Sequence, residues 1–373
     1  MRVIIITNSL SSGGAEKQML WIARTLVTKG IPCAIFEMQA RSSNHRIAEL
    51  ITAATEAGVE FRRAALKETY FTTWIRLHDF VRAHSTAIVW TWGFRSDLSI
   101  LLMHWLGFKR RWICSLRTAN MEAFRSLDWL VHACIEQNAY YASNTYAARE
   151  FLGIVHPGSK LRCHVIYNFV PESASAVKTL PAVLPRPLHV VMPGNIEHPK
   201  KGYDIVIQLA ELIKKECLPI KIHVGGRPDR IGLFAKQIAE RELETVLIYH
   251  GEVDAPHEFL KSGDCFLLVS RYEGMPNSLL EATSIGLPAI TTVVGDLGQL
   301  VETKEEMYLV PIEDVAAVKR CLVDILSDWP AAVEMAGRGR LWCERNFAAE
   351  NCTQQILHLL NDVSQGNDTV CAE

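Results

Sequence analysis

The sequence lacks several features that would assign it to a class at once. It has no run approaching ~18 uninterrupted apolar residues, so we expect no membrane-spanning helix. The apolar start, Val3–Ile6, is too short for a secretory signal. Its ten cysteines form no C-x-x-C pair and have no zinc-site spacing with histidines. We therefore expect a cytoplasmic protein in which the cysteines are small, buried apolar residues.

Net charge is also nearly absent, but the two halves of the chain differ. With 39 Lys and Arg against 41 Asp and Glu, the formal charge is -2. Residues 1–170 contain 20 basic and 12 acidic residues, a balance of +8, whereas residues 171–373 contain 19 and 29, a balance of -10. Such an asymmetry indicates that one half meets an anionic partner. The 373 residues, 49% of them hydrophobic, suffice for two domains, which excludes a disordered or fibrous chain.

Short β-rich runs alternate with helical patterns in both halves, which predicts an α/β protein with parallel sheets covered by helices. The strands expected in the first half are Val3–Asn8, Pro32–Met38, Ala87–Trp92, Arg111–Arg117, Tyr140–Asn144 and Cys163–Asn168. Those of the second half are Leu188–Gly194, Ile220–Gly225, Leu247–Gly251, Cys265–Ser270, Pro288–Val293 and Met307–Pro311. The clearest helices are expected at Ala15–Lys29, Tyr203–Cys217, Asn277–Ile285, Val315–Leu326 and Ala331–Asn346.

The two halves are separated by a change in composition. Residues 171–187 are rich in Pro, Ser and Ala, which predicts an interdomain linker, with a long surface loop as the alternative. We thus expect two Rossmann-like, doubly wound domains, residues 1–170 and 188–349, that face each other across a cleft. A ligand belongs in such a cleft, at the carboxyl ends of the strands.

Two glycines open a helix after the first expected strand. Gly13 and Gly14, followed by Ala15-Glu16-Lys17, let backbone amides approach an anion that the helix dipole attracts. The spacing is not the G-x-G-x-x-G dinucleotide fingerprint, which disfavours an oxidoreductase. A tight turn that merely needs positive φ is the equally open alternative.

A strand, a Gly/Pro turn and a helix follow one another at 270–282. The amides at the start of this helix face whatever lies above the strand ends, and a diphosphate fits there. Glu273 at the strand tip can reach a sugar hydroxyl, and Glu281 can accept from a ribose diol. For Glu281, a capping box with Ser278 is the alternative that needs no ligand. The candidate residues of the turn and helix start are Pro276, Asn277, Ser278 and Leu279.

Adjacent lysines lie in the turn after the first strand of the second half. Gly194 and Asn195 precede Lys200, Lys201 and Gly202. Ammonium groups at a βα turn suit phosphate oxygens as point charges. The alternative is an ordinary solvated surface pair.

Taken together, these segments resemble one family. Gly13-Gly14-Ala15-Glu16-Lys17, Asn168-Phe169-Val170-Pro171, the turn at 194–202, and Glu273-x7-Glu281 followed by Gly286-Leu287-Pro288 are similar to the retaining glycosyltransferases of family 4 (glycosyl transferases group 1), which have the GT-B fold. The resemblance covers nearly the whole chain, and the E-x7-E block is its most specific part. It implies a first domain on the acceptor side, completed by a C-terminal helix at about 350–373, and a second domain that binds the donor.

The resemblance also implies how the donor is held. Gly13, Gly14 and the helix start at 276–279 would bind the donor diphosphate, Glu281 the ribose and Glu273 the donor sugar.

Two positions depart from the family pattern. Lys201 keeps the phosphate-binding lysine, but Asn195 stands where the family usually has Arg, so Lys200 or Arg227 would have to compensate. Arg117 stands where a His often lies close to the donor sugar. We list Glu273, Lys201 and Arg117 as the predicted catalytic residues.

The activity implied by the resemblance is transfer of a hexosyl group from a nucleoside-diphosphate sugar, with UDP favoured, to a glycan or lipid-linked glycan in cell-surface polysaccharide synthesis. The front-face mechanism requires no protein nucleophile and no metal, the nucleotide sugar is a substrate and no cofactor is expected. We expect no nucleic-acid partner. Two alternatives remain open, a nucleotide-sugar epimerase of the same fold and a non-catalytic homologue that binds a nucleotide sugar.

The acceptor side carries a basic, aromatic-flanked segment. An apolar stretch from Leu98 ends in Trp105 and continues through Phe108 to Lys109-Arg110-Arg111-Trp112. This combination would suit an anionic membrane surface, which predicts peripheral association at the inner face of the membrane. A helix packed on the sheet, with its basic residues snorkelling at one end, is the alternative.

Overall fold

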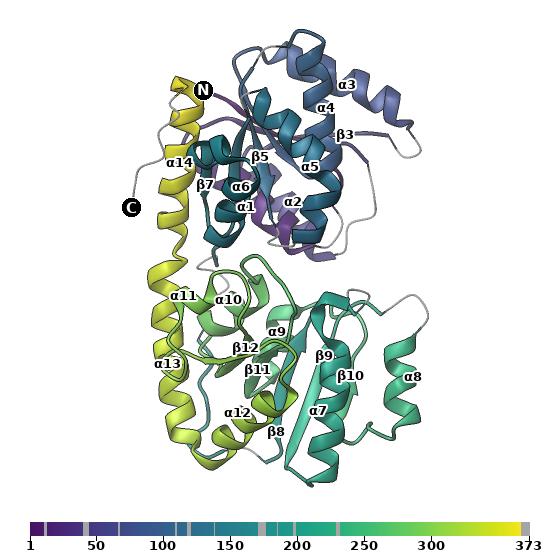
Figure 1. Ribbon diagram of the computed structural model, residues 1–373, viewed down its shortest axis with the longest axis vertical. Coiled ribbons are helices and arrows are strands. Elements are labelled where there is room, and N and C mark those ends of the chain that lie inside the picture. Colours follow the sequence, from purple (N-terminus) through teal and green to yellow (C-terminus); the bar gives the residue numbers. More distant parts are fainter. Residues whose placement is uncertain are drawn as a thin grey trace. The chain divides into compact units, whose positions relative to one another are not determined.

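The computed structural model describes residues 1–10, 13–39, 45–65, 68–108, 110–117, 121–137, 139–170, 177–184, 186–196, 199–228 and 232–366. It divides the chain into two compact units (Figure 1). The first contains residues 1–167 and the C-terminal residues from Cys352, and the second contains residues 168–351. Each is built on one parallel sheet with helices around it, which confirms the predicted α/β class and the two Rossmann-like domains.

The first unit contains a seven-stranded parallel sheet in the order β3-β2-β1-β4-β5-β6-β7. Its inner strands are continuous apolar runs because helices cover both faces of a parallel sheet; all five residues of β1, Val-Ile-Ile-Ile-Thr, are buried. The strands are β1 (Val3–Thr7), β2 (Cys33–Glu37), β3 (Glu60–Arg63), β4 (Ile88–Trp92), β5 (Trp112–Leu116), β6 (Tyr140–Ser143) and β7 (Cys163–Val165). The helices are α1 (Gly14–Thr28), α2 (His45–Glu56), α3 (Tyr70–Ala83), α4 (Phe94–Trp105), α5 (Met121–Glu136), α6 (Tyr146–Val155) and the 3-10 helix η1 (Pro157–Arg162).

The edge strand β3 is absent from the sequence prediction. Its sequence, Glu-Phe-Arg-Arg, has neither an apolar run nor a clear alternation, because an edge strand packs few of its side chains. It is held to the sheet by pairing with β2 and by ion pairs, Arg2 to Glu60 and Arg63 to Glu37.

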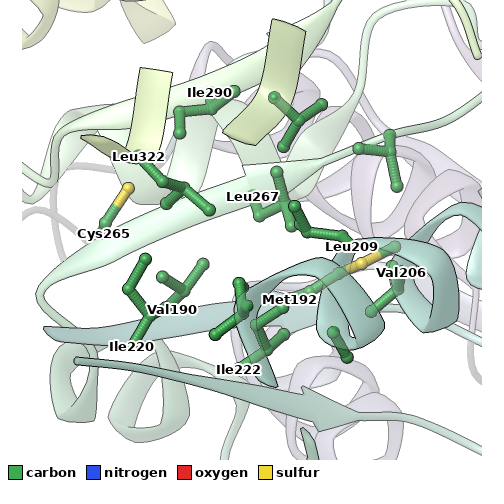
Figure 2. Close-up of a cluster of buried hydrophobic side chains, with 14 of the residues drawn as sticks. Val190, Met192, Val206, Leu209, Ile220, Ile222, Cys265, Leu267, Ile290 and Leu322 are labelled. Atoms are coloured by element: carbon green, nitrogen blue, oxygen red, sulfur yellow. The ribbon is translucent and has the colours of Figure 1, made fainter. Parts of the chain in front are cut away.

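The second unit contains a six-stranded parallel sheet in the order β10-β9-β8-β11-β12-β13. Alternate residues of its strands pack against helices such as α7, as the buried cluster in Figure 2 shows for Val190 and Met192 of β8 and Val206 of α7. The strands are β8 (Leu188–Pro193), β9 (Ile220–Gly225), β10 (Leu247–Tyr249), β11 (Cys265–Leu268), β12 (Ala289–Thr292) and β13 (Tyr308–Val310). The helices are η3 (Pro199–Lys201), α7 (Tyr203–Lys215), α8 (Leu233–Glu240), α9 (Pro256–Ser262), α10 (Asn277–Ser284), α11 (Leu297–Leu300), α12 (Val315–Ser327) and α13 (Trp329–Asn346).

Helix α14 (Ala349–Gln365) starts in the second unit and, from Cys352 on, belongs to the first. The expected strands Val3–Asn8, Leu247–Gly251 and Cys265–Ser270 all end earlier in the structure, at Thr7, Tyr249 and Leu268. The extra residues at the carboxyl ends belong to loops, and in parallel sheets these loops carry the functional groups.

Part of the segment expected to be a linker is bound to the second unit. Residues 171–176 and 185 lie outside the described residues. Lys178 donates its backbone N–H to the Ile285 carbonyl at 2.9 Å, and Trp329 Nε1 donates to the Pro181 carbonyl at 2.8 Å. Leu180 and Leu184 pack on the core of this unit, so two apolar side chains hold a Pro-rich segment that forms no strand.

Candidate functional site

The second unit places two loops at the point where its strand order reverses. From β8 the chain moves to β9 and β10 on one side and later returns to β11 on the other side of β8. The loops after β8 (194–202) and after β11 (269–276) therefore leave neighbouring strands at their carboxyl ends. Ligands of doubly wound sheets bind at such a switch point.

Backbone contacts join these two loops. The N–H of Arg271 donates to the carbonyl of Lys200 at 2.7 Å. Gly202 has φ +70°, and a Cβ there would lie 2.2 Å from the Val269 carbonyl oxygen. Only glycine fits this close approach in the left-handed region. The contact fixes Lys200 and Lys201 beside the end of β11.

Lys201 and Glu273 form the central ion pair of the site. Lys201 Nζ lies 2.6 Å from Glu273 Oε1, and Lys200 Nζ lies 3.7 Å from Oε2. The Ser270 hydroxyl also donates to Oε1, at 3.0 Å. The side chains of Glu273 and Lys201 are 11% and 17% exposed, so the pair is largely shielded from water.

The charges around Glu273 decide its protonation. Burial alone would raise the pKa of this carboxyl, but Lys201, Lys200 and the Ser270 hydroxyl outweigh it, so the pKa is lowered from its usual 4.5. Glu273 is therefore ionised at neutral pH. Because an ammonium has three N–H donors, Lys201 can hold a second anion while it pairs with Glu273.

The turn after β8 brings Asn195 to the same loop. Gly194 accepts a hydrogen bond from the Tyr203 hydroxyl at 2.6 Å. A Cβ at Gly226 would lie 1.7 Å from the Gly194 carbonyl oxygen, so the turns after β8 and β9 require glycine where they touch. The packing of these turns leaves Asn195 half-buried next to Gly194.

Helix α10 begins inside the loop after β11. Its N-cap is Pro276, and Ser278 is already the second helical residue, so the capping box that was the alternative role for Glu281 is not formed. Asn168 Nδ2 donates to the Met275 carbonyl at 2.7 Å and anchors the approach to the helix. The first-turn amides, at Asn277, Ser278 and Leu279, lie where the helix dipole favours an anion.

The predicted glycine pair lies in the first unit, at the start of α1. Gly13 is the N-cap with φ -85°, and neither it nor Gly14 belongs to the described glycines with positive φ. The interpretation of this turn as one that needs positive φ is therefore wrong. Gly13 has no side chain to cap the helix, and the carboxylate of Glu16 lies beside it, since a Cβ at Gly13 would be 2.0 Å from Glu16 Oε2. The role of this turn in binding a donor diphosphate stays a prediction.

The first unit has its own pocket, at the switch point between β1 and β4. Its volume is about 440 Å³. It is lined at the carboxyl ends of three neighbouring strands by Asn8 after β1, Trp92 of β4 and Arg117 after β5, with Asp97 from the first turn of α4. Trp92 is 6% exposed. Among the described residues, Trp92 Nε1 and Asn8 Oδ1 have no hydrogen-bond partner.

Arg117 is thus a residue of this pocket. Its guanidinium carbon lies 4.1 Å from the centroid of the Trp92 ring, a cation–π contact. Burial lowers the pKa of Arg117 to about 9, so it remains charged at neutral pH. The structure brings Lys201 and Glu273 together in the second unit, whereas Arg117 belongs to the first.

The pH dependence of stability will report the state of Asp97. Burial raises its pKa from 3.8 to about 7, although hydrogen bonds from Thr91 and Cys114 oppose the shift. The unfolded chain loses this proton near pH 4 and the folded chain near 7, so rising pH removes stability across that interval. Between pH 4 and 8, we expect the free energy of unfolding of Asp97→Asn to gain about 2 kcal/mol relative to wild type. This is less than the full pKa shift implies, because the Asp97 side chain is only partly buried. Denaturant titration at both pH values measures this; Asp79→Asn, at an exposed acid, should show no such gain.

Sequence reasoning missed the residues that support the predicted ones. Arg271 bonds Lys200 of the other loop, whereas Ser270 and Tyr203 bond Glu273 and Gly194 of the loop to which each is attached. The spacing of residues in the sequence does not specify these contacts. Asp97 had a local signal, because an acid in the first helical turn after a buried strand faces the ligand end of the sheet.

Comparison with known proteins gives a consistent classification. Residues 187–328, which contain both site loops, match the family model of the glycosyl transferases group 1. The Anabaena HepE protein, in complex with UDP and glucose, has the same fold, with a TM-score of 0.80, 15% identity and coverage of 97% of this chain and 99% of that one. The chain thus has the GT-B fold.

The curated relatives are similar over part of their length. A Staphylococcus aureus poly(ribitol-phosphate) alpha-N-acetylglucosaminyltransferase is 20% identical over 220 residues, 57% of this chain and 45% of the relative. The Bacillus anthracis N-acetyl-alpha-D-glucosaminyl L-malate synthase is 23% identical over 245 residues, 64% of this chain and 63% of the relative.

The sequence analysis predicts that the chain has no membrane-spanning helix. Among the described residues, none of the helices has the length and apolar character needed to cross a bilayer.

Proposed function

We propose that this protein is a retaining glycosyltransferase that moves a hexosyl group from a nucleoside-diphosphate sugar, with UDP favoured, to a glycan or lipid-linked glycan in cell-surface polysaccharide synthesis. The observation that carries the proposal is the Lys201–Glu273 pair, next to the start of α10 at the switch point of the second unit. Cation, helix amides and carboxylate are the groups that a diphosphate and a sugar require.

The mechanism follows from where charge builds up. As the sugar leaves, negative charge grows on the diphosphate, and Lys201 with the amides at 277–279 stabilises it. Glu273 holds the Lys201 ammonium in place and offers its carboxylate to a sugar hydroxyl. The acceptor hydroxyl attacks the face from which the diphosphate departs, and a phosphate oxygen takes its proton. The proposal assigns no nucleophile to the protein and no metal to the reaction.

The pocket of the first unit supports the acceptor side of the proposal. Trp92 Nε1 is a buried donor and Asn8 Oδ1 a buried acceptor, and both line the pocket. A sugar hydroxyl donates and accepts at once, so it satisfies the two groups together. Arg117 adds a positive charge that suits a phosphate or carboxylate of the acceptor.

A ligand screen followed by a transfer assay tests the proposed function. We expect one or more UDP-sugars to raise the midpoint of thermal unfolding, and the stabilising sugar to appear on an added glycan acceptor. Conversion of the donor to another sugar without acceptor would favour the epimerase. Donor binding with neither transfer to any acceptor tested nor hydrolysis of the donor would favour the non-catalytic homologue.

Glu281 is expected to contribute to donor affinity. Its capping role is absent, and it lies one turn into α10. If it binds the ribose, Glu281→Ala loses a hydrogen bond to a charged group and weakens UDP binding by about 1.5–3 kcal/mol. Calorimetric titration with UDP measures the loss; unchanged affinity with unchanged fold would remove Glu281 from the donor site.

We further propose that the end of α4 touches the membrane. Trp105 and Leu106 are 56% and 73% exposed. Arg110, a basic residue of the same segment, contacts the protein: its guanidinium lies 4.8 Å from the Phe108 ring and donates to the His84 carbonyl. Lys109 lies outside the described residues. We expect co-sedimentation with anionic liposomes, reduced in a Trp105→Ala, Leu106→Ala double variant because both apolar contacts are lost. Equal sedimentation of variant and wild type would favour the packed-helix alternative.

A further inference from the structure

A cluster of two histidines and an aspartate, which shares no residue with either candidate site, lies where α14 meets the edge strand β7 in the first unit (Figure 1). His164 comes from β7, and His358 and Asp362 come from α14, four residues apart and therefore on one face of the helix. His164 and Asp362 are 7% and 4% exposed, whereas the side chain of His358 is 47% exposed.

The donor atoms have the spacing of metal ligands. His164 Nε2 lies 3.6 Å and His358 Nδ1 3.3 Å from the same atom, Asp362 Oδ2, and all three ligand atoms lie within 4.8 Å of one another. Zinc binds such atoms at about 2.0–2.2 Å, so the edges of its tetrahedron measure about 3.4 Å. A metal ion thus fits between the three atoms with little movement.

Hydrogen bonding within the cluster does not account for this geometry. Both distances exceed the usual range for N–H···O bonds. Asp362 Oδ2 is a buried carboxylate oxygen that accepts no hydrogen bond from any of the described residues. A buried oxygen without a hydrogen-bond donor is costly, and a bound cation would satisfy it.

We propose that His164, His358 and Asp362 form a binding site for a divalent transition-metal ion such as Zn²⁺. Imidazole and carboxylate ligands suit such ions. The exposed side of His358 gives the ion a route of entry and leaves room for water as a fourth ligand, so the site is open and exchangeable. Because its ligands come from β7 and α14, the bound ion would fasten the C-terminal helix to the edge of the sheet. The site is independent of sugar transfer.

Metal titration of the full chain tests this proposal. Cys217 is exposed, so the experiment uses a Cys217→Ser background freed of metal with EDTA. Calorimetry with ZnCl₂ should show one equivalent bound, and Co²⁺ should give a visible d–d spectrum. His358→Gln and Asp362→Asn should each weaken Zn²⁺ binding at least ~10-fold. Zn²⁺ should also raise the midpoint of thermal unfolding of the background protein but not of these variants.

A matched control exists in the same unit. His132 and Glu136 on α5 form an exposed pair with the same i,i+4 spacing, at 3.0 Å. His132→Gln should leave Zn²⁺ affinity unchanged. The proposal is overturned if the protein binds no Zn²⁺, or if affinity survives in both ligand variants. It is equally overturned if binding depends instead on His223, the middle ring of the hydrogen-bonded chain His189–His223–His250.

Discussion

Replacing Lys201 with alanine is expected to lower kcat for sugar transfer ~10²-fold or more, the effect of removing one preorganised electrostatic contact to a developing charge. The structure explains why no neighbour takes over. Lys201 is fixed beside β11 by Gly202 and lies 2.6 Å from Glu273, whereas Lys200 stands 3.7 Å away from the same carboxylate, next to the Tyr272 ring. Steady-state kinetics with the donor found in the screen measures the change, and most of it should fall on kcat rather than KM.

Two lysine variants serve as controls for this experiment. Lys200→Ala should cost less than ~10-fold, because a more exposed cation is screened by water. Lys214→Ala, at the far end of α7 where the side chain binds the Glu242 carbonyl, should leave turnover unchanged. Unchanged turnover in Lys201→Ala would remove this residue from the catalytic machinery.

Glu273→Gln is expected to reduce the stability of the second unit and to impair transfer. The substitution leaves two lysines facing each other without their carboxylate. Breaking a fully buried pair costs 3–5 kcal/mol, and this pair retains some exposure, so we expect a loss of about 2 kcal/mol. Denaturant titration measures the loss, and kcat should fall in the same variant because Lys201 is no longer held in place.

The pH dependence of this loss distinguishes a charge effect from a packing effect. The folded-state pKa of Glu273 lies below its usual 4.5, so its stabilisation is present above that pH and is lost as pH falls through the folded-state value. The difference between wild type and Glu273→Gln should therefore shrink in acid. A difference that stays constant down to pH 3 would mean that the amide disturbs packing and that the ion pair adds little. Ser270→Ala, which removes only the neutral donor to Glu273, should show a smaller loss that changes less with pH.

The sequence located the strands well because parallel strands are buried on both faces. Runs such as Val3–Ile6 and Cys265–Leu268 are apolar throughout, and helices with periodic apolar residues separate them. It failed at β3, where an edge strand buries few side chains, and at strand ends, where polar loop residues continue the extended pattern. The bound segment at 177–184 was also beyond it, because Pro-rich composition says nothing about what two leucines contact.

The sequence pointed to candidate residues for the site but not to their contacts. Lys201, Glu273 and the start of α10 became candidates because a βα turn leaves characteristic glycines, prolines and charges in the sequence, and their role in donor binding stays a prediction. The capping box of Ser278 and Glu281 also followed from spacing, and it was wrong because the N-cap is Pro276 rather than Ser278.

By itself, the sequence determined the α/β class, the two domains and the two loops of the candidate site, because these depend on local periodicity and turn chemistry. Only the tertiary structure decided which distant groups meet. It paired Lys201 with Glu273, enclosed Asp97 and Arg117 in one pocket, and brought His164 beside His358 and Asp362. The order of strands in a sheet and the return of the last helix set these contacts, and no pattern of neighbouring residues encodes either.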